Sequence, residues 1–200
     1  MIYLHKLLKY KYAFALIVFL SGVVGIILQI LRAYSSSNFG ETTLITSFYF
    51  TTQANLFVTI ISLLFLLKLD KKKWFKYIVF VTLISISITA IVFHILLTPY
   101  MENIDYIQHH LHTVNPALFL MLYFLFYRQE LPLKKGWVGL IYPLIYMLSV
   151  YIIIEPFFGD LAARVKLIFD NARYIYPFFD PNSSLLIRQV MENQRKEKRF

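Results

Sequence analysis

The amino-acid sequence predicts an all-α protein, a polytopic bundle of membrane-spanning helices with five clear spans. Hydrophobic residues make up 58% of the 200 residues and charged residues only 16%, whereas a soluble domain carries about 25% charged residues. The apolar residues fall in long runs, and each run can cross a hydrocarbon layer about 30 Å thick as one helix. Short charged connections separate the runs, so the net charge of +9 indicates orientation in a membrane rather than binding to nucleic acid.

The spans follow one another within a single predicted transmembrane domain, residues 1–200. The first span covers about residues 12–31, where Gly22 and Gly25 are suited to close helix packing. The next four are predicted at about 44–67, 75–97, 111–127 and 137–154, and Glu155 with Pro156 closes the last of them. Residues 156–187 form either an outer loop or a short, degenerate sixth span, and residues 188–200 form a basic tail.

The distribution of charge predicts the orientation of these spans in the cell membrane. Lysines precede the first span and fill the second connection, whereas the third connection carries Glu102 and Asp105 and no Lys or Arg. By the positive-inside rule the N-terminus is cytoplasmic and the odd-numbered connections lie outside. Five spans would leave the basic tail outside, so the side on which the chain ends stays open.

The residue types present also narrow the expected ligands. The chain has no cysteine, which excludes disulfides, thiolate metal sites and cysteine nucleophiles. We expect no cofactor, no bound metal and no nucleic acid, and the expected partners are membrane lipids and a lipid-like substrate. The sequence carries no signal for an oligomeric state.

Polar residues from four segments reach the same membrane level in this topology. Such residues are costly inside apolar spans, so their convergence in the outer half of the bilayer predicts a functional site. The candidates are Thr51, Thr52, Gln53 and Asn55 of the second span, His94 of the third, His109 and His112 at the start of the fourth, and Glu155 at the end of the fifth.

Two chemistries fit these residues. A threonine hydroxyl can act as a nucleophile with a histidine as its general base, while Asn or Gln donates to the developing oxyanion. Alternatively, His109 and His112 share a helix face and bind a metal together with His94 and Glu155, although His-x-x-His alone is a weak signal. Each residue also has a structural interpretation: a span threonine more often bonds its own helix carbonyl, and His109 and His110 suit a solvated loop.

Four segments resemble one family of membrane proteins. Residues 50–56 (FTTQANL) resemble the segment F-T-x-Q-S-N-L of small bacterial multi-pass proteins related to the androgen-induced and androgen-dependent membrane hydrolases. Residues 89–94 (TAIVFH), 112–116 (HTVNP) and 176–181 (YPFFDP) resemble that family's T-G-x-V-[YF]-H, H-x-x-x-P and Y-P-[YF]-[PF]-x-D-P segments. The resemblance covers roughly residues 44–181. The family has six spans, and here residues 185–187 and a charged tail stand where the sixth is expected.

The resemblance implies a hydrolase of fatty acid esters of hydroxy fatty acids, with a threonine nucleophile and a histidine inside the membrane. The family's histidine falls on His112. The bacterial spacing selects Thr51 and the animal spacing selects Thr52; only one can face His112, because a helix turns about 100° per residue, and Thr51 is slightly preferred. The predicted function is therefore an intramembrane threonine–histidine hydrolase acting on a lipid ester. The alternative is a non-enzymatic multi-pass protein: a lipid or small-solute transporter, or an assembly factor.

Overall fold

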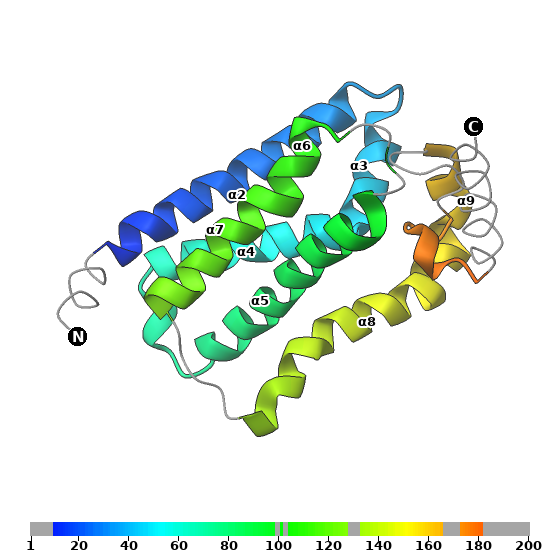
Figure 1. Ribbon diagram of the computed structural model, residues 1–200. Coiled ribbons are helices and arrows are strands. Elements are labelled where there is room, and N and C mark those ends of the chain that lie inside the picture. The colour runs from blue at the N-terminus through cyan, green and yellow to red at the C-terminus, as the bar shows by residue number, and fades with distance from the viewer. Residues whose placement is uncertain (1–9, 99–100, 102–103, 128–132, 166–172, 182–200) are drawn as a thin grey trace, which may run out of the picture. The chain divides into compact units, whose positions relative to one another are not determined.

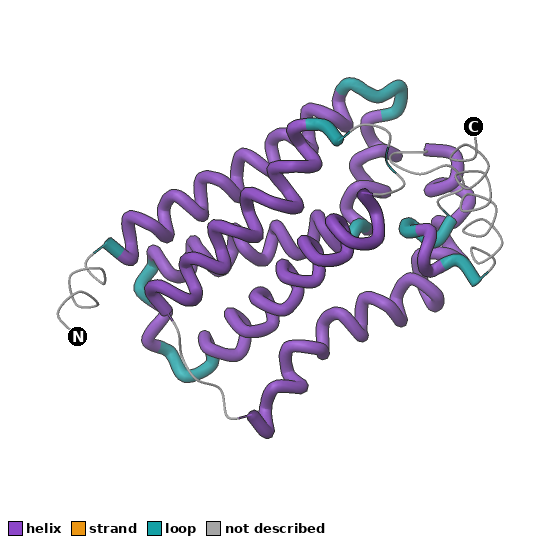
Figure 2. The backbone as a smooth tube through the Cα atoms, in the orientation of Figure 1, coloured by secondary structure: helices purple, strands orange, loops and turns teal. Residues whose placement is uncertain are grey.

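The computed structural model describes residues 10–98, 101, 104–127, 133–165 and 173–181. All regular structure in these ranges is helical, which confirms the predicted all-α class, and Figure 2 shows the helices joined by short loops. Contacts divide the chain into two compact units, Met1–Tyr146 and Met147–Phe200, and each is described by itself. The prediction of one domain over residues 1–200 stays a prediction.

Within the described ranges, three helices are long and apolar enough to cross a membrane: Lys11–Tyr34, Phe75–Leu97 and Lys135–Val165. Phe39–Phe48 and Phe50–Leu66 together make a fourth if this bent pair is one span. The predicted span at 111–127 lies within a helical stretch over residues 106–127 that is not among them, because its first half carries three histidines and an asparagine. The described part of the chain thus contains three to four helices of membrane-spanning character.

The helix α2 (Lys11–Tyr34) packs mainly along α4 (Phe50–Leu66), and α7 (Asn115–Met121) lies beside it (Figure 1). A Cβ atom on Gly22 would lie 3.1 Å from Cβ and 3.3 Å from Cα of Thr59 on α4. A Cβ atom on Gly25 would lie 3.0 Å from Cδ2 of Leu111 and 3.3 Å from Nδ2 of Asn115. The predicted role of the two glycines in close helix packing is confirmed, since a larger side chain would push the helices apart.

The predicted second span, 44–67, is not one helix. It consists of α3 (Phe39–Phe48) and α4, which meet at an angle of 78° at Tyr49. Tyr49 has an extended backbone (φ −67°, ψ 132°), so the helical hydrogen bonds are interrupted on both sides of it. The hydroxyl of Tyr146 compensates, because it donates to the carbonyl of Phe48 (2.9 Å) and accepts from the N–H of Phe50 (3.2 Å). A buried break in a membrane helix needs such a partner.

Ion pairs mark the two ends of α2. At its start, Nζ of Lys11 lies 3.0 Å from Oδ2 of Asp70, in the short helix η1 (Leu69–Lys71) between α4 and α5 (Phe75–Val92). Near its end, Arg32 pairs with Asp105, just before α6 (Tyr106–His109). Successive connections therefore lie at opposite ends of a helix about 36 Å long, as an alternating series of spans requires.

Two other helical stretches switch between α-helical and π-helical hydrogen bonding along their length. After α5 comes a π-helical turn, η2 (Phe93–Leu97); after α6 come a second such turn, η4 (His110–Val114), then α7 and a third, η5 (Leu122–Tyr127). The helix over 106–127 begins before the predicted start at 111, because Asp105 caps it: its Oδ1 accepts from the N–H of Gln108 at 2.8 Å. The two histidines that precede residue 111 are consequently helical.

The last long helix comprises η6 (Leu133–Leu140), α8 (Ile141–Ser149), the π-helical turn η7 (Val150–Ile154) and α9 (Glu155–Val165). The helix continues past the predicted end of the fifth span at residue 154, since Pro156 stands in the first turn of α9, where a missing N–H is tolerated. In the second unit, Arg173 pairs with Glu155 and Asp160, and the short helix η8 (Pro177–Phe179) follows. The predicted basic tail, 188–200, lies outside the described residues, as do residues 166–172 and 182–187 of the predicted loop or sixth span.

Candidate active site

A buried threonine and a buried histidine form a hydrogen bond in the first unit. Oγ1 of Thr51 lies 3.0 Å from Nε2 of His112, and only 7% and 5% of these residues are exposed. Thr51 is in the first turn of α4, and His112 is in the middle of η4. Thr51 and His112, the preferred nucleophile and the histidine predicted from the sequence, are therefore in direct contact.

The hydrogen bond of the second ring nitrogen, Nδ1, determines which nitrogen of His112 carries the proton. Nδ1 is 2.9 Å from the carbonyl oxygen of Gln108, and a carbonyl can only accept, so Nδ1 carries the proton. In the neutral imidazole Nε2 then has a free lone pair, and the Thr51 hydroxyl donates to it. The ring also stacks on Phe93 of η2, with centroids 3.9 Å apart and planes at 13°. The imidazole is therefore held in the tautomer and orientation of a general base for Thr51.

The break at Tyr49 explains why Thr51 is available for this bond. A threonine inside a helix usually donates to the carbonyl four residues before it. For Thr51 that residue is Ser47, which lies in α3 before the break; its carbonyl accepts from Nε2 of Gln53 at 2.9 Å. The first turn of a helix also carries partial positive charge, which favours a developing alkoxide at Thr51.

The neighbouring threonine faces a different helix. Oγ1 of Thr52 donates to Oε1 of Gln29 on α2 at 2.8 Å. The rotation of about 100° between successive residues therefore separates the two threonines, as expected. Of the two candidates left open by the sequence, Thr51 faces His112 and Thr52 does not.

Asn55 and Gln53 do not have the arrangement expected of oxyanion donors. Nδ2 of Asn55 donates to the carbonyls of Thr51 (2.8 Å) and Leu111 (3.1 Å), which uses both of its hydrogens. The amide of Gln53 is also engaged, since Nε2 bonds Ser47 and Oε1 accepts from the hydroxyl of Tyr142. We correct the expectation accordingly: Asn55 connects the backbone at Thr51 to the backbone beside His112.

A proline explains why the carbonyl of Leu111 needs Asn55. In a π-helical turn each N–H reaches the carbonyl five residues back, as the N–H of Asn115 does to His110. Pro116 follows and has no N–H, so the carbonyl of Leu111, five residues before it, loses that donor. Pro116 thus leaves the carbonyl of Leu111, the residue before His112, without a backbone donor, and the Asn55 amide donates to it.

The remaining predicted residues bond to partners other than Thr51 and His112, or are exposed. His94 is 3.0 Å from Oγ1 of Thr113 through Nε2, in an exposed position, and His109 is exposed on its helix. Glu155 belongs to the second unit, where Nη2 and Nε of Arg173 donate to it at 3.0 Å and 3.2 Å. Among the described residues no three His, Asp or Glu side chains gather into a group that could hold a metal ion.

His109 and His112 do not converge as the metal hypothesis expected. His109 is exposed, whereas His112 is buried. The physical reason is the π-helical turn that begins at residue 110, because its wider turn changes the angle between positions i and i+3. The shared helix face inferred from the sequence assumed a regular α-helix.

Sequence reasoning missed a buried polar network that supports the site. Asn115 donates through Nδ2 to Oδ1 of Asn55 at 2.9 Å and accepts from the hydroxyl of Ser21 on α2. Nε2 of His110 donates to the carbonyl of Ser21 at 2.9 Å, and only 5% of His110 is exposed, so its interpretation as a loop residue is wrong. The signal was present: Asp105-x-x-Gln108 has the spacing of a capping box, which places the helix start before His110.

Comparisons with family models, with curated proteins and with solved structures gave no match. The family resemblance therefore stays a prediction. Of the four segments that carry it, three meet in the first unit: 50–56 supplies Thr51, 89–94 supplies Phe93 and 112–116 supplies His112. The fourth, 176–181, lies in the second unit.

Proposed function

We propose that the chain is an intramembrane hydrolase of a lipid ester, with Thr51 as the nucleophile and His112 as its general base. The observation that carries the proposal is the 3.0 Å bond from the Thr51 hydroxyl to Nε2 of a histidine whose Nδ1–H is held by a carbonyl. This is the arrangement that activates a hydroxyl, which is a weak nucleophile at its free pKa. The resemblance of residues 50–56 and 112–116 to ester hydrolases supports a lipid ester as the substrate.

The reaction follows from the roles of the two side chains. His112 takes the hydroxyl proton through Nε2 while Oγ1 of Thr51 attacks the ester carbonyl carbon, and the carbonyl oxygen becomes an oxyanion. The oxyanion collapses, the C–O bond to the alcohol breaks, and His112 returns the proton to the leaving alkoxide. Water then attacks the acyl-threonine with the same histidine as base, which releases the acid and restores Thr51. The positive end of α4 lies beside Thr51 and favours the charge that develops there.

The membrane setting is part of the proposal. The spans at 12–31, 44–67, 75–97, 111–127 and 137–154 cross the bilayer, the N-terminus is cytoplasmic and the Thr51–His112 pair lies in the outer half. The alternation of connections between the ends of α2 supports this, because the lysine-rich connection lies at the Lys11 end.

The natural absence of cysteine makes the topology directly testable. In cells, a membrane-impermeant maleimide is expected to label Met101→Cys before permeabilisation and Lys72→Cys only after it. The reverse pattern would contradict the orientation.

Labelling of membranes with a fluorophosphonate probe tests the nucleophile. We expect Thr51→Val to remove labelling and Thr51→Ser to retain it, because serine supplies the same hydroxyl. Thr52→Val and Thr59→Val should label like the parent; Thr59 is the matched control, since its hydroxyl is buried on the same helix and bonds its own helix at 2.9 Å. Labelling of Thr51→Val at the parental rate would show that the nucleophile is wrongly assigned.

A parent protein that does not label would favour the alternative, a transporter or assembly factor without enzymatic activity. Its signature would be substrate flux, or co-purification of a partner, that persists in the double variant Thr51→Val, His112→Phe.

A further inference from the structure

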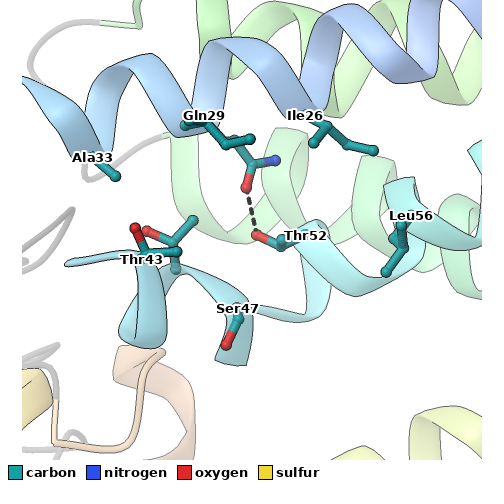
Figure 3. A pocket seen from close by; sticks show the side chains of 9 residues that line it. Ile26, Gln29, Ala33, Thr43, Ser47, Thr52 and Leu56 are labelled. Atoms are coloured by element: carbon teal, nitrogen blue, oxygen red, sulfur yellow. Dashed lines mark hydrogen bonds between the residues drawn. The ribbon is translucent and has the colours of Figure 1, made fainter. Parts of the chain in front are cut away.

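A second candidate site lies between α2, α3 and α4. A partly open pocket of about 150 Å³ is enclosed there by residues of all three helices. Figure 3 shows Gln29 of α2 reaching across to Thr52 of α4, with Thr43 and Ser47 of α3 on the same side as Thr52. Neither Thr51 nor His112 lines the pocket, so it is distinct from the candidate active site.

Two polar groups that line this pocket have no hydrogen-bond partner among the described residues, and one of them, Oγ1 of Thr43, is fully buried. Gln29 is only 8% exposed; its Oε1 accepts from Thr52, but within the described part of the chain its side-chain NH₂ has no hydrogen-bond partner. Oγ1 of Thr43 is likewise buried and has no hydrogen-bond partner among the described residues. Buried polar groups are nearly always hydrogen-bonded, so two unsatisfied donors that line one pocket indicate a ligand with an acceptor.

The rest of the pocket limits the chemistry of that ligand. Ile26, Ile30 and Leu56 supply apolar walls, and none of the described residues that line the pocket is charged. A cavity of about 150 Å³ with aliphatic walls holds roughly as many atoms as benzene. The ligand is therefore neutral, has a short apolar body in the pocket and presents an oxygen that accepts hydrogen bonds.

The position of the pocket identifies the source of such a ligand. Ile30 and Leu56 are 47% and 43% exposed on helices of membrane-spanning character, so the pocket has an apolar rim that faces lipid. Gln29 lies five residues before the end of α2, about 7.5 Å along the axis. In a bilayer this depth is just inside the hydrocarbon boundary, where lipid acyl chains join their polar groups.

We propose that this pocket binds the acyl ester group of a membrane lipid. The ester carbonyl accepts from the side-chain NH₂ of Gln29 and from the hydroxyl of Thr43, and the first carbons of the acyl chain lie against Ile26 and Ile30. Binding here needs no reaction at Thr51. The site therefore goes beyond the proposed hydrolase and would exist in a non-enzymatic protein as well.

Photoaffinity labelling of the purified full chain in detergent tests the site. The probe is a fatty acid methyl ester with a diazirine close to the carbonyl, and the expected labels fall within residues 26–33 or 43–56. Gln29→Leu removes one hydrogen bond and should lower labelling about fivefold. Ala33→Leu fills the pocket and should lower labelling about tenfold. Ile27→Ala is the control, because Ile27 is 48% exposed on the same helix and does not line the pocket.

Competition and cross-checks separate this proposal from the hydrolase. Methyl hexanoate should compete with the probe, and hexanoate should not, because none of the described residues that line the pocket is cationic. Thr51→Val should photolabel like the parent, and Gln29→Leu should keep its fluorophosphonate labelling. Equal photolabelling of the parent, Gln29→Leu and Ala33→Leu, or labels spread over lipid-facing positions, would overturn the pocket assignment.

Discussion

The first turn and the middle of α4 use hydroxyl side chains in opposite ways. In the middle of the helix, the hydroxyls of Thr59 and Ser62 donate to the carbonyls four residues before them, at 2.9 Å and 2.7 Å. In the first turn, Thr51 and Thr52 bond side chains of other helices instead. All four residues lie on one apolar helix, so neither composition nor hydropathy separates them.

The difference lies in the backbone that precedes each hydroxyl. A hydroxyl within a regular helix finds a carbonyl one turn back, whereas the break at Tyr49 removes that carbonyl for the first turn of α4. A break in a span therefore converts a packing threonine into one that other helices can use. Hydroxyls that follow a break are the ones to examine for function.

The largest expected effect on labelling comes from removing His112, the predicted base that Thr51 contacts in the first turn of α4. His112→Phe keeps a ring to stack on Phe93 but loses Nε2, so the rate of fluorophosphonate labelling should fall by about 10³-fold or more, as loss of general-base catalysis does. His109→Phe, on the exposed face of the same helix, should change the rate less than about twofold. If His112→Phe labels at the parental rate, His112 is not the base for Thr51, and the first turn of α4 has no catalytic role of the kind proposed.

The next largest effect is expected at Asn55, which bonds the backbone carbonyls of both Thr51 and Leu111. Asn55→Leu keeps the side-chain volume but leaves the carbonyl of Leu111 and the Nδ2 group of Asn115 buried without their partner. We expect a loss of about 2–4 kcal/mol in the free energy of unfolding, measured in mixed micelles, because each buried unsatisfied group costs about 1–3 kcal/mol. A loss below about 1 kcal/mol would mean that the network does not support the site.

In the middle of α4, stability is expected to depend mainly on close packing against Gly22 of α2. Gly22→Ala places a Cβ against the backbone and Cβ of Thr59, and overpacking of this kind costs about 1–3 kcal/mol. Gly136→Ala is the matched control, since its Cβ would meet nothing within 4 Å among the described residues. Equal stability of the two variants would contradict the close contact of α2 and α4.

A smaller effect is expected at the break itself. Tyr146→Phe removes the hydroxyl that bonds Phe48 and Phe50 on either side of Tyr49, and should cost about 1–2 kcal/mol of unfolding free energy. Labelling at Thr51 should also slow, because the first turn loses a support, whereas Tyr34→Phe at an exposed position should alter neither quantity. Unchanged labelling would show that the break holds its geometry without Tyr146.

The smallest effect tests the ordinary hydroxyls. Ser62→Ala removes only a bond to the carbonyl of Val58, within its own helix, and side-chain hydrogen bonds in membrane helices are worth about 0.6 kcal/mol on average. We therefore expect a change of at most about 0.6 kcal/mol in unfolding and none in labelling. A loss above about 2 kcal/mol would show that the middle of α4 also depends on its hydroxyls.

Much of the candidate site could be predicted because it depends on local pattern. The polarity of Thr51 and His112 within apolar runs, together with the predicted alternation of the spans, was sufficient to predict that the two side chains lie near one another. Their contact could not be derived, since it requires the break at Tyr49 and the π-helical turn around His112. The oxyanion role expected of Asn55 was wrong because residue type does not show which carbonyls a buried amide must satisfy.

By itself, the sequence determined the helical class, the presence of helices apolar enough to cross a membrane and the importance of Gly22 for packing, because these follow from periodicity, length and side-chain size. Only the tertiary structure decided between Thr51 and Thr52, brought His110 into the buried network and formed the pocket beside Gln29. The physical reason is the same in each case. A helix that changes direction or register alters which side chains face one another, and that change depends on hydrogen bonds from distant residues such as Tyr146.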